Sequence, residues 1–193
     1  IRDRESQMSA RRDKNRCVSP MSGNVSELIF MHDVLGRHSA EYYFDREVGY
    51  IFVAEPHWLD EAYSSAIAIT DTGILLRNAK NTDLVTRAIK ASRYPFDKGI
   101  DLGGGHGLFV RAMRDAGYDF HWSDKYAENI FARGFEATPG RYGIATAFEV
   151  LEHVHDPLSF LREGRERFGF DTCLFSATCF KDTEIPGTDW WYW

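Results

Sequence analysis

Short apolar runs alternate with helical patterns from residue 98 onward. The apolar runs lie at 99–102, 119–122, 142–148 and 172–176, and amphipathic patterns with the period of a helix lie at 107–116, 127–133 and 157–168. Short continuous apolar runs are typical of parallel strands that are buried on both faces. This alternation predicts an α/β fold with a doubly wound, mostly parallel sheet of the Rossmann-like type. A weaker run at 135–138 is expected to add one strand.

The first half of the chain has a different pattern. Strand-like runs at 28–30, 40–44 and 50–53 are punctuated by glycines, which predicts a small β-rich N-terminal appendage over residues 17–54. Helical patterns within 55–97 predict a helical connector to the Rossmann-like domain at 98–193. Residues 1–16 carry six Lys or Arg side chains, and we interpret them as a disordered basic tail.

A glycine-rich turn follows the run at 99–102. It reads Asp101-Leu102-Gly103-Gly104-Gly105-His106-Gly107, and an amphipathic helix begins directly after it. Glycines let the backbone approach a ligand, and the N–H groups of a helix N-terminus face whatever binds there. The dinucleotide fingerprint is G-x-G-x-x-G, but here the third glycine comes one residue earlier and an acid precedes the first glycine by two residues. Asp101 is suited to pair with the ammonium group of an amino-acid moiety, which a pyrophosphate lacks.

The next candidate is Asp124, at the end of the run 119–122. It follows the glycine-rich turn by about twenty residues, where an acid can accept hydrogen bonds from both hydroxyls of a ribose. An ordinary turn over residues 123–126 is the alternative interpretation. Asp101, Asp124 and Glu149 all end predicted strands, so we expect them to converge on one crevice.

The third motif is Ala147-Phe148-Glu149-Val150-Leu151-Glu152-His153-Val154-His155-Asp156-Pro157. It closely resembles the class I S-adenosylmethionine-dependent methyltransferases, in particular the subset that methylates ubiquinone precursors and many small natural products, and the glycine-rich turn resembles their motif I. The resemblance implies S-adenosylmethionine as cofactor, bound by Asp101, Gly103, Gly104, Gly105, Gly107, Asp124, Phe148 and Glu149. It also implies that Glu152 and His153 lie on the acceptor side, with His153 as a general base. A histidine held structurally at a helix start is the alternative.

The resemblance extends upstream, to residues 55–64 and 71–78. Relatives in that branch often carry two Cys-x-x-Cys pairs ahead of this segment, and the corresponding positions here are Cys17, Pro20, Asp45 and Val48. One thiolate cannot hold a tetrahedral structural zinc ion. We therefore expect a degenerate zinc knuckle that binds no metal.

Composition narrows the partners and the compartment. The net charge of −6 over 193 residues argues against nucleic acid, and no apolar run has the length of a membrane span. Three cysteines, Cys17, Cys173 and Cys179, are too few and too scattered for a disulfide framework. These features predict a cytoplasmic protein.

The methyltransferase sheet normally continues beyond the strand at 172–176 with two antiparallel strands, which we expect to be missing here. The outer edge of that strand would then be covered either by a second copy of the chain, in a homo-oligomer, or by the segment beyond Phe180. In both cases we expect the chain to bind its cofactor but to turn over poorly, because the acceptor side is incomplete.

The motifs and the resemblance together imply methyl transfer from S-adenosylmethionine to a small-molecule acceptor, which the sequence does not identify. One alternative is a cofactor-binding or interaction protein without activity. Another is a NAD-dependent oxidoreductase, which the glycine spacing disfavours.

Overall fold

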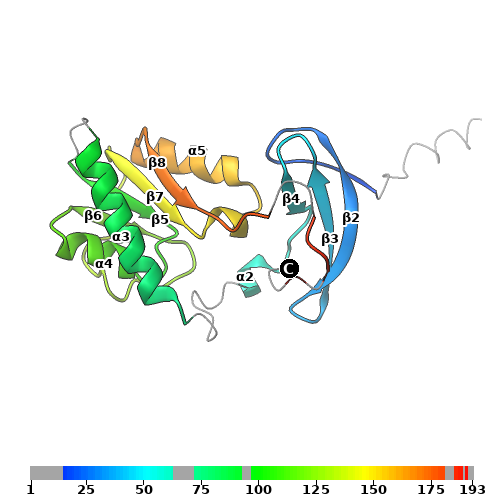
Figure 1. Cartoon of the computed structure of the whole chain (residues 1–193), viewed down its shortest axis with the longest axis horizontal. Coiled ribbons are helices and arrows are strands. Elements are labelled where there is room, and N and C mark those ends of the chain that lie inside the picture. The colour runs from blue at the N-terminus through cyan, green and yellow to red at the C-terminus, as the bar shows by residue number, and fades with distance from the viewer. Residues whose placement is uncertain (1–14, 63–71, 93–96, 181–184, 189, 191–193) are drawn as a thin grey trace, which may run out of the picture. The chain divides into compact units, whose positions relative to one another are not determined.

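The computed structural model describes residues 15–62, 72–92, 97–180, 185–188 and 190. The chain divides into two compact units, Ile1–Trp58 with Cys179–Trp193, and Leu59–Thr178 (Figure 1). Both helices of the predicted connector therefore lie in the second unit, and the segment from Cys179 lies in the first. Most of the predicted tail at 1–16 falls outside the described residues, although Arg16 already begins a strand.

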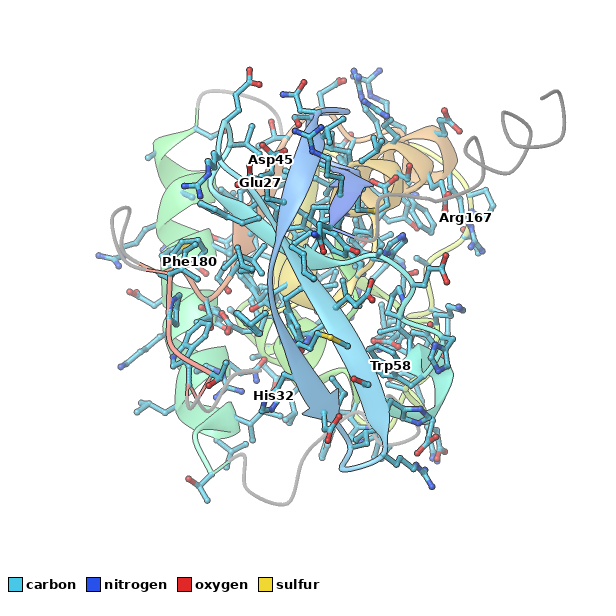
Figure 2. All side chains as sticks on the ribbon, turned by 90° about the vertical axis from the view of Figure 1, so that its right-hand side faces the viewer. Glu27, His32, Asp45, Trp58, Arg167 and Phe180 are labelled. Atoms are coloured by element: carbon cyan, nitrogen blue, oxygen red, sulfur yellow. The ribbon has the colours of Figure 1, made fainter. Side chains whose placement is uncertain are left out.

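The first unit is an antiparallel sheet with the strand order β1-β2-β3-β4. Its strands are β1 (Arg16–Val18), β2 (Val25–Val34), β3 (His38–Asp45) and β4 (Tyr50–Val53). The three strand-like runs of the sequence lie within β2, β3 and β4, and Gly36 and Gly49 make the connecting turns in the left-handed conformation. Figure 2 shows Glu27 and Asp45 near one end of the β2–β3 hairpin and His32 near the other.

Aromatic side chains pack on both faces of this sheet. Tyr42 and Tyr43 are successive residues of β3, so they point to opposite faces. Tyr42 stacks on Phe30 with ring centroids 4.8 Å apart, and Tyr43 stacks on Phe52 at 5.8 Å. From the far end of the chain, Phe180 packs its ring on Phe44 at 6.1 Å. Phe180 therefore packs against the sheet of the first unit, although it lies far from that sheet along the chain.

Two turns of the first unit are joined through the side chain of Asp45. Asp45 is buried at the end of β3 and accepts hydrogen bonds from the hydroxyls of Ser19 and Ser22 and from the backbone N–H of Glu47. Burial opposes the charge of this carboxylate, but these bonds outweigh it and lower the pKa of Asp45. The turn at 19–24 is therefore held to the turn after β3 by hydrogen bonds.

The second unit is built on a parallel sheet with the order β6-β5-β7-β8. Its strands are β5 (Gly99–Leu102), β6 (Phe120–Ser123), β7 (Ile144–Phe148) and β8 (Cys173–Ser176), and its helices are α2 (Leu59–Ala62), α3 (Ile74–Ala91), α4 (Leu108–Asp115) and α5 (Pro157–Phe168). β5 is buried along its whole length. β6 and β8 are the outer strands of the sheet that the structure describes, and Phe175 on β8 is 59% exposed.

Helices cover both faces of the parallel sheet. One core cluster joins Val85 of α3 and Met113 of α4 to Phe120 and Ile144 of the sheet. The other joins Phe168 at the end of α5 to Ile100 and Ala145. Ile144 and Ala145 are successive residues of β7 and belong to different clusters, so α5 lies on the face opposite α3 and α4. This is the Rossmann-like α/β arrangement that the sequence predicts.

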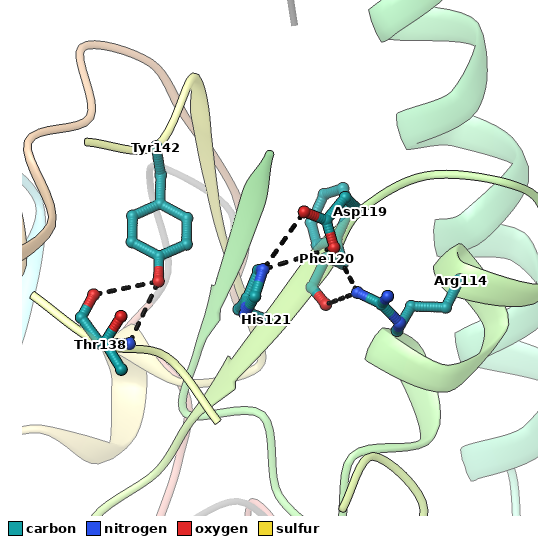
Figure 3. Close-up of polar contacts among 6 residues, drawn as sticks. All are labelled: Arg114, Asp119, Phe120, His121, Thr138 and Tyr142. Atoms are coloured by element: carbon teal, nitrogen blue, oxygen red, sulfur yellow. Dashed lines mark hydrogen bonds and ion pairs between the residues drawn. The ribbon is translucent and has the colours of Figure 1, made fainter. Parts of the chain in front are cut away.

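Polar contacts close the amino end of this sheet (Figure 3). Arg114 at the end of α4 donates to the carboxylate of Asp119 and, at 2.9 Å, to the carbonyl of Phe120. Tyr142, before the start of β7, donates its hydroxyl to the carbonyl of Thr138 at 3.0 Å. The contacts of Arg114 lie at the start of β6, at the end of the strand opposite to the glycine-rich turn.

The helix predicted at 127–133 is wrong. Asn129 is buried there and bonds to its own segment: its Oδ1 accepts the N–H of Ala132 at 2.9 Å, and its Nδ2 donates to the carbonyl of Ala132 at 2.8 Å. Local side-chain bonds of this kind compete with helix formation. The strand predicted at 135–138 is reduced to one parallel bridge between Trp122 and Glu136. Among the described residues, no helix is long and apolar enough to cross a membrane.

Candidate functional site

Three of the four glycines in the glycine-rich turn have no room for a side chain, and the fourth, Gly105, has open space beside it. Gly103, Gly105 and Gly107 adopt positive φ angles of 69°, 53° and 86°. A Cβ at Gly103, Gly104 or Gly107 would lie within 2.8 Å of the side chains of Val150, Trp122 and Asn129, respectively. A Cβ at Gly105 would meet nothing within 4 Å. The turn is therefore packed against the protein on three sides, and its backbone is accessible at Gly105.

The peptide groups of Gly105 are held by two residues from the end of β6. The N–H of Gly105 donates to Oδ2 of Asp124 at 2.9 Å, and the indole N–H of Trp122 donates to the carbonyl of Gly105 at 2.8 Å. Oδ1 of Asp124 accepts the N–H groups of Tyr126 and Ala127. Asp124 therefore organises an ordinary turn with one oxygen and faces the glycine-rich turn with the other. The turn interpretation is therefore observed, and the ribose role of Asp124 stays a prediction.

Asp101 lies in β5, just before the glycine-rich turn, and its side chain is buried inside the protein. The residue is only 4% exposed, and its Oδ1 accepts the hydroxyl of Thr146 on β7 at 2.6 Å. Burial raises the pKa of Asp101 to about 7, the bond from Thr146 opposes that shift, and the charge of Asp124 adds to it. A carboxyl group with this pKa is divided between its neutral and charged forms near neutral pH.

A second cluster of polar groups lies where β7 and β8 end. Glu149 has a φ of 55°, in the left-handed region that non-glycine residues seldom adopt. Its backbone N–H donates to the carbonyl of Ser176 at 3.1 Å, and the hydroxyl of Ser176 donates to its Oε1 at 2.6 Å. Oε1 of Glu152 accepts the N–H of Thr178 at 3.2 Å. Two carboxylates are therefore fixed at the ends of these neighbouring strands.

The remaining predicted site residues lie around these two groups. Phe148 is half-buried and packs its ring on Phe109 of α4, with centroids 5.2 Å apart. His153 ends the 3₁₀ helix η1 (Leu151–His153) and is exposed. His106 anchors the turn with its side chain, because its Nδ1 lies 2.9 Å from the carbonyl of Glu128. Because a carbonyl oxygen can only accept a hydrogen bond, Nδ1 of His106 carries the proton in this contact.

Sequence reasoning missed three residues that hold the site. Trp122 fixes Gly105, Thr146 fixes Asp101, and Ser176 fixes Glu149. One signal was available for Thr146, which is a polar residue within the apolar run of β7 and needs a partner when buried. The indole of Trp122 and the hydroxyl of Ser176 occur in strands where such residues are common, so their roles were not visible.

The residues around the glycine-rich turn fit an adenosine-type cofactor with an amino-acid tail. Gly105 supplies open space beside a backbone that no side chain blocks, and acidic groups lie on either side of it at Asp101 and Asp124. The described residues contain no group of three or more His, Cys, Asp and Glu side chains that could hold a metal ion.

Comparison with known proteins gives one finding on identity. A search of curated proteins returns no match. A family model described as a methyltransferase domain matches residues 75–193, which is more than half of the 193-residue chain and includes all four strands of the parallel sheet. The match agrees with the α/β architecture, and the chain belongs to the methyltransferase domain family.

Proposed function

We propose that the chain is a class I methyltransferase that uses S-adenosylmethionine and acts on a small-molecule acceptor. The observation that carries the proposal is the glycine-rich turn with its open position at Gly105 between the acids Asp101 and Asp124. Methyltransferase activity follows from the family, whereas this cofactor, the acceptor class and the likeness to the ubiquinone-type subset are parts of the proposal.

The cofactor would be bound by groups from three strand ends. Asp101 is suited to the ammonium group of the amino-acid moiety and Asp124 to the hydroxyls of the ribose. Gly105 keeps a side chain out of the space that the cofactor would fill, and Phe148 and Glu149 would border it from the end of β7. Gly103, Gly104 and Gly107 let the turn pack closely against Val150, Trp122 and Asn129, so that its backbone can approach the cofactor. Bound S-adenosylmethionine supplies an electrophilic methyl group on its sulfonium, and the task of the protein is to align the acceptor with that group in a dry crevice.

The acceptor side is assigned to the end of β7. His153 is exposed, and a neutral imidazole there would take the proton of an acceptor hydroxyl or amine. Glu152 is held by the N–H of Thr178, so its carboxylate has a fixed place next to the 3₁₀ helix. In this scheme Glu152 orients the acceptor and His153 acts as the general base.

Thermal-shift measurements with S-adenosylmethionine, S-adenosylhomocysteine and NAD test the proposal. Ligands that bind only the native state raise the melting temperature, and the stabilisation grows with the logarithm of the ligand concentration divided by the dissociation constant. We expect a shift with the first two and none with NAD. A shift with NAD alone would instead support the oxidoreductase interpretation. If S-adenosylhomocysteine binds but no acceptor is methylated, the chain is a cofactor-binding protein without activity.

Replacing His153 separates binding from catalysis. His153→Gln keeps a polar side chain but removes the base, so we expect unchanged affinity for S-adenosylhomocysteine and a loss of turnover of about 10²-fold or more for an acceptor that carries a proton. His155→Gln, two residues further and also exposed, is the matched control. Equal turnover in both variants would show that His153 is not the general base and would favour the structural interpretation of this residue.

A further inference from the structure

Thr146 is the least expected polar group in the core of the parallel sheet. It is fully buried in β7, between Ala145 and Ala147, which are buried as well. The register of the sheet places it directly beside Asp101 of β5. Its hydroxyl lies 2.6 Å from Oδ1 of Asp101 and 3.3 Å from the carbonyl of Ile100. A buried hydroxyl that bonds to a buried acid is costly to assemble unless both groups are satisfied.

The two contacts of this hydroxyl serve both charge states of Asp101. When Asp101 is ionised, the Thr146 hydroxyl donates its proton to the carboxylate. When Asp101 is protonated, the carboxyl O–H donates to Oγ1 of Thr146 and the hydroxyl donates to the carbonyl of Ile100 instead. The bond to the ionised form is charge-assisted and therefore the stronger of the two. Thr146 thus favours the charged carboxylate inside an environment that disfavours it.

The other ionisable groups near Asp101 do not help to keep it charged. Asp124 at the end of β6 adds a negative charge, and Cys173 on β8 is a thiol whose own pKa is raised by burial and by Asp101. Gly104 packs directly over the acid, because a Cβ there would lie 2.9 Å from Oδ2 of Asp101. Thr146 is the neighbouring group that favours the charged form of Asp101 among the interactions described.

We infer that Thr146 is a positioning residue for the cofactor: it holds Asp101 in the orientation and charge state in which the carboxylate receives the ammonium group of an amino-acid moiety. This inference rests on the proposed function, since it takes the ligand to be an adenosine carrying an amino-acid tail. It adds that binding of such a ligand is coupled to the loss of a proton from a buried acid, with Thr146 setting the pH at which that occurs.

Binding of S-adenosylhomocysteine measured by calorimetry between pH 5.5 and 8.5 tests this coupling. In the wild-type protein, affinity should rise with pH and level off above the pKa of Asp101, which is about 7. Thr146→Val has the same shape but no hydroxyl, so the midpoint should move upward by about one pH unit. At pH 7 that displacement weakens binding about fivefold, and the difference should shrink towards zero above pH 8.

Three controls make the result specific. Thr146→Ser restores the hydroxyl and should restore the wild-type profile. Thr86→Val removes another buried hydroxyl, one that has no hydrogen-bond partner among the described residues, and should leave the profile unchanged. Methylthioadenosine lacks the amino-acid tail, so its affinity should not respond to Thr146→Val at any pH. The inference is overturned if Thr146→Val weakens binding of S-adenosylhomocysteine by the same factor at every pH. It is also overturned if the midpoint of the pH profile of binding is the same in the variant and in the wild-type protein.

A ligand-free measurement separates this inference from the proposed function. The carboxyl ¹³C resonance of Asp101 reports its titration directly, and its midpoint should be higher in Thr146→Val than in the wild-type protein. An unchanged midpoint overturns the role of Thr146 even if the cofactor binds. If neither S-adenosylmethionine nor S-adenosylhomocysteine binds to the folded wild-type protein, the proposed function fails, while a raised midpoint would still support the control of Asp101 by Thr146.

Discussion

Gly105 shows how much of this site depends on a missing side chain. It has a positive φ and open space where a Cβ would be. Gly117, directly after α4, has the same two properties but lies at the other end of that helix. The two glycines therefore have the same backbone conformation and the same open surroundings, but only Gly105 lies at the candidate site.

Substituting alanine at each glycine separates strain from obstruction. Gly105→Ala and Gly117→Ala should each lower the free energy of unfolding by about 1–2 kcal/mol, the cost of placing a Cβ in the left-handed conformation. Only Gly105→Ala should also abolish the thermal shift with S-adenosylhomocysteine. Chemical denaturation and thermal-shift assays on both variants measure the two effects. If Gly117→Ala also loses binding of S-adenosylhomocysteine, the loss in Gly105→Ala comes from lower stability of the fold and not from obstruction of the site.

Asp124 carries the second prediction for a single residue. Its Oδ2 is bonded to a backbone N–H of the glycine-rich turn, and we expect it to accept the ribose hydroxyls of the cofactor. Asp124→Ala should weaken binding of S-adenosylhomocysteine by about 1–3 kcal/mol, the range for hydrogen bonds to a charged group. Calorimetry measures the change. Asp83→Ala, which removes an exposed aspartate paired with Arg87 on α3, is the control. An unchanged dissociation constant in Asp124→Ala would leave only its turn-forming role.

The acids of the site could be predicted from the sequence, but their partners could not. Asp101 lies near the end of an apolar run, and Asp124 and Glu149 follow such runs, so their place near a strand end follows from local pattern. Thr146 lies 45 residues from Asp101 along the chain, and Ser176 lies 27 residues from Glu149. Such pairs form only through the order and register of the strands, which the local pattern does not contain.

At the scale of elements, the helices with clear end signals were predicted well. α5 begins at Pro157, its N-cap Asp156 accepts the N–H of Ser159 at 2.9 Å, and Gly169 ends it in the left-handed conformation. These are the residues expected at each end of a helix. The segment 127–133 has the same apolar spacing but is not helical, because the side chain of Asn129 bonds to the backbone of Ala132. Periodicity alone could not show that competition.

The joined turns of the first unit give the third prediction. Asp45 is 2% exposed and accepts several hydrogen bonds, so Asp45→Ala should lower the free energy of unfolding by about 1–3 kcal/mol. The pKa of Asp45 is lowered in the folded protein, so its contribution is present above the unfolded pKa of about 4 and is lost as pH falls below it. Urea unfolding of both proteins at pH 7 and pH 3 should therefore show a gap that narrows at low pH. Asp33→Ala, at an exposed position of β2, is the control.

The same turns bear on the expected absence of zinc. Because serine hydroxyls and a backbone N–H surround the Asp45 carboxylate, we expect protein purified without added metal to contain no stoichiometric zinc. Elemental analysis measures this. A zinc content of one per chain, together with unfolding by a chelator, would contradict the degenerate-knuckle interpretation.

At the scale of the whole molecule, β8, one of the two outer strands of the described parallel sheet, carries the last prediction. β8 pairs with β7, and Phe175 on it is 59% exposed. We expect a second copy of the chain to cover this strand, giving a dimer in sedimentation velocity. Phe175→Glu should shift the protein to the monomer without changing its melting profile in the monomeric state. A monomer at all concentrations in the wild-type protein would contradict this expectation.

The first unit is discontinuous along the chain, and this has a consequence for synthesis. A ribosome completes β1 to β4 before the methyltransferase half begins, but Phe180, which packs on Phe44, is made more than one hundred residues later. The contact of Phe180 with Phe44 therefore cannot form until the whole parallel sheet has been translated. At about 5–20 residues per second that delay is on the order of ten seconds, so the contact between Phe44 and Phe180 forms late in synthesis.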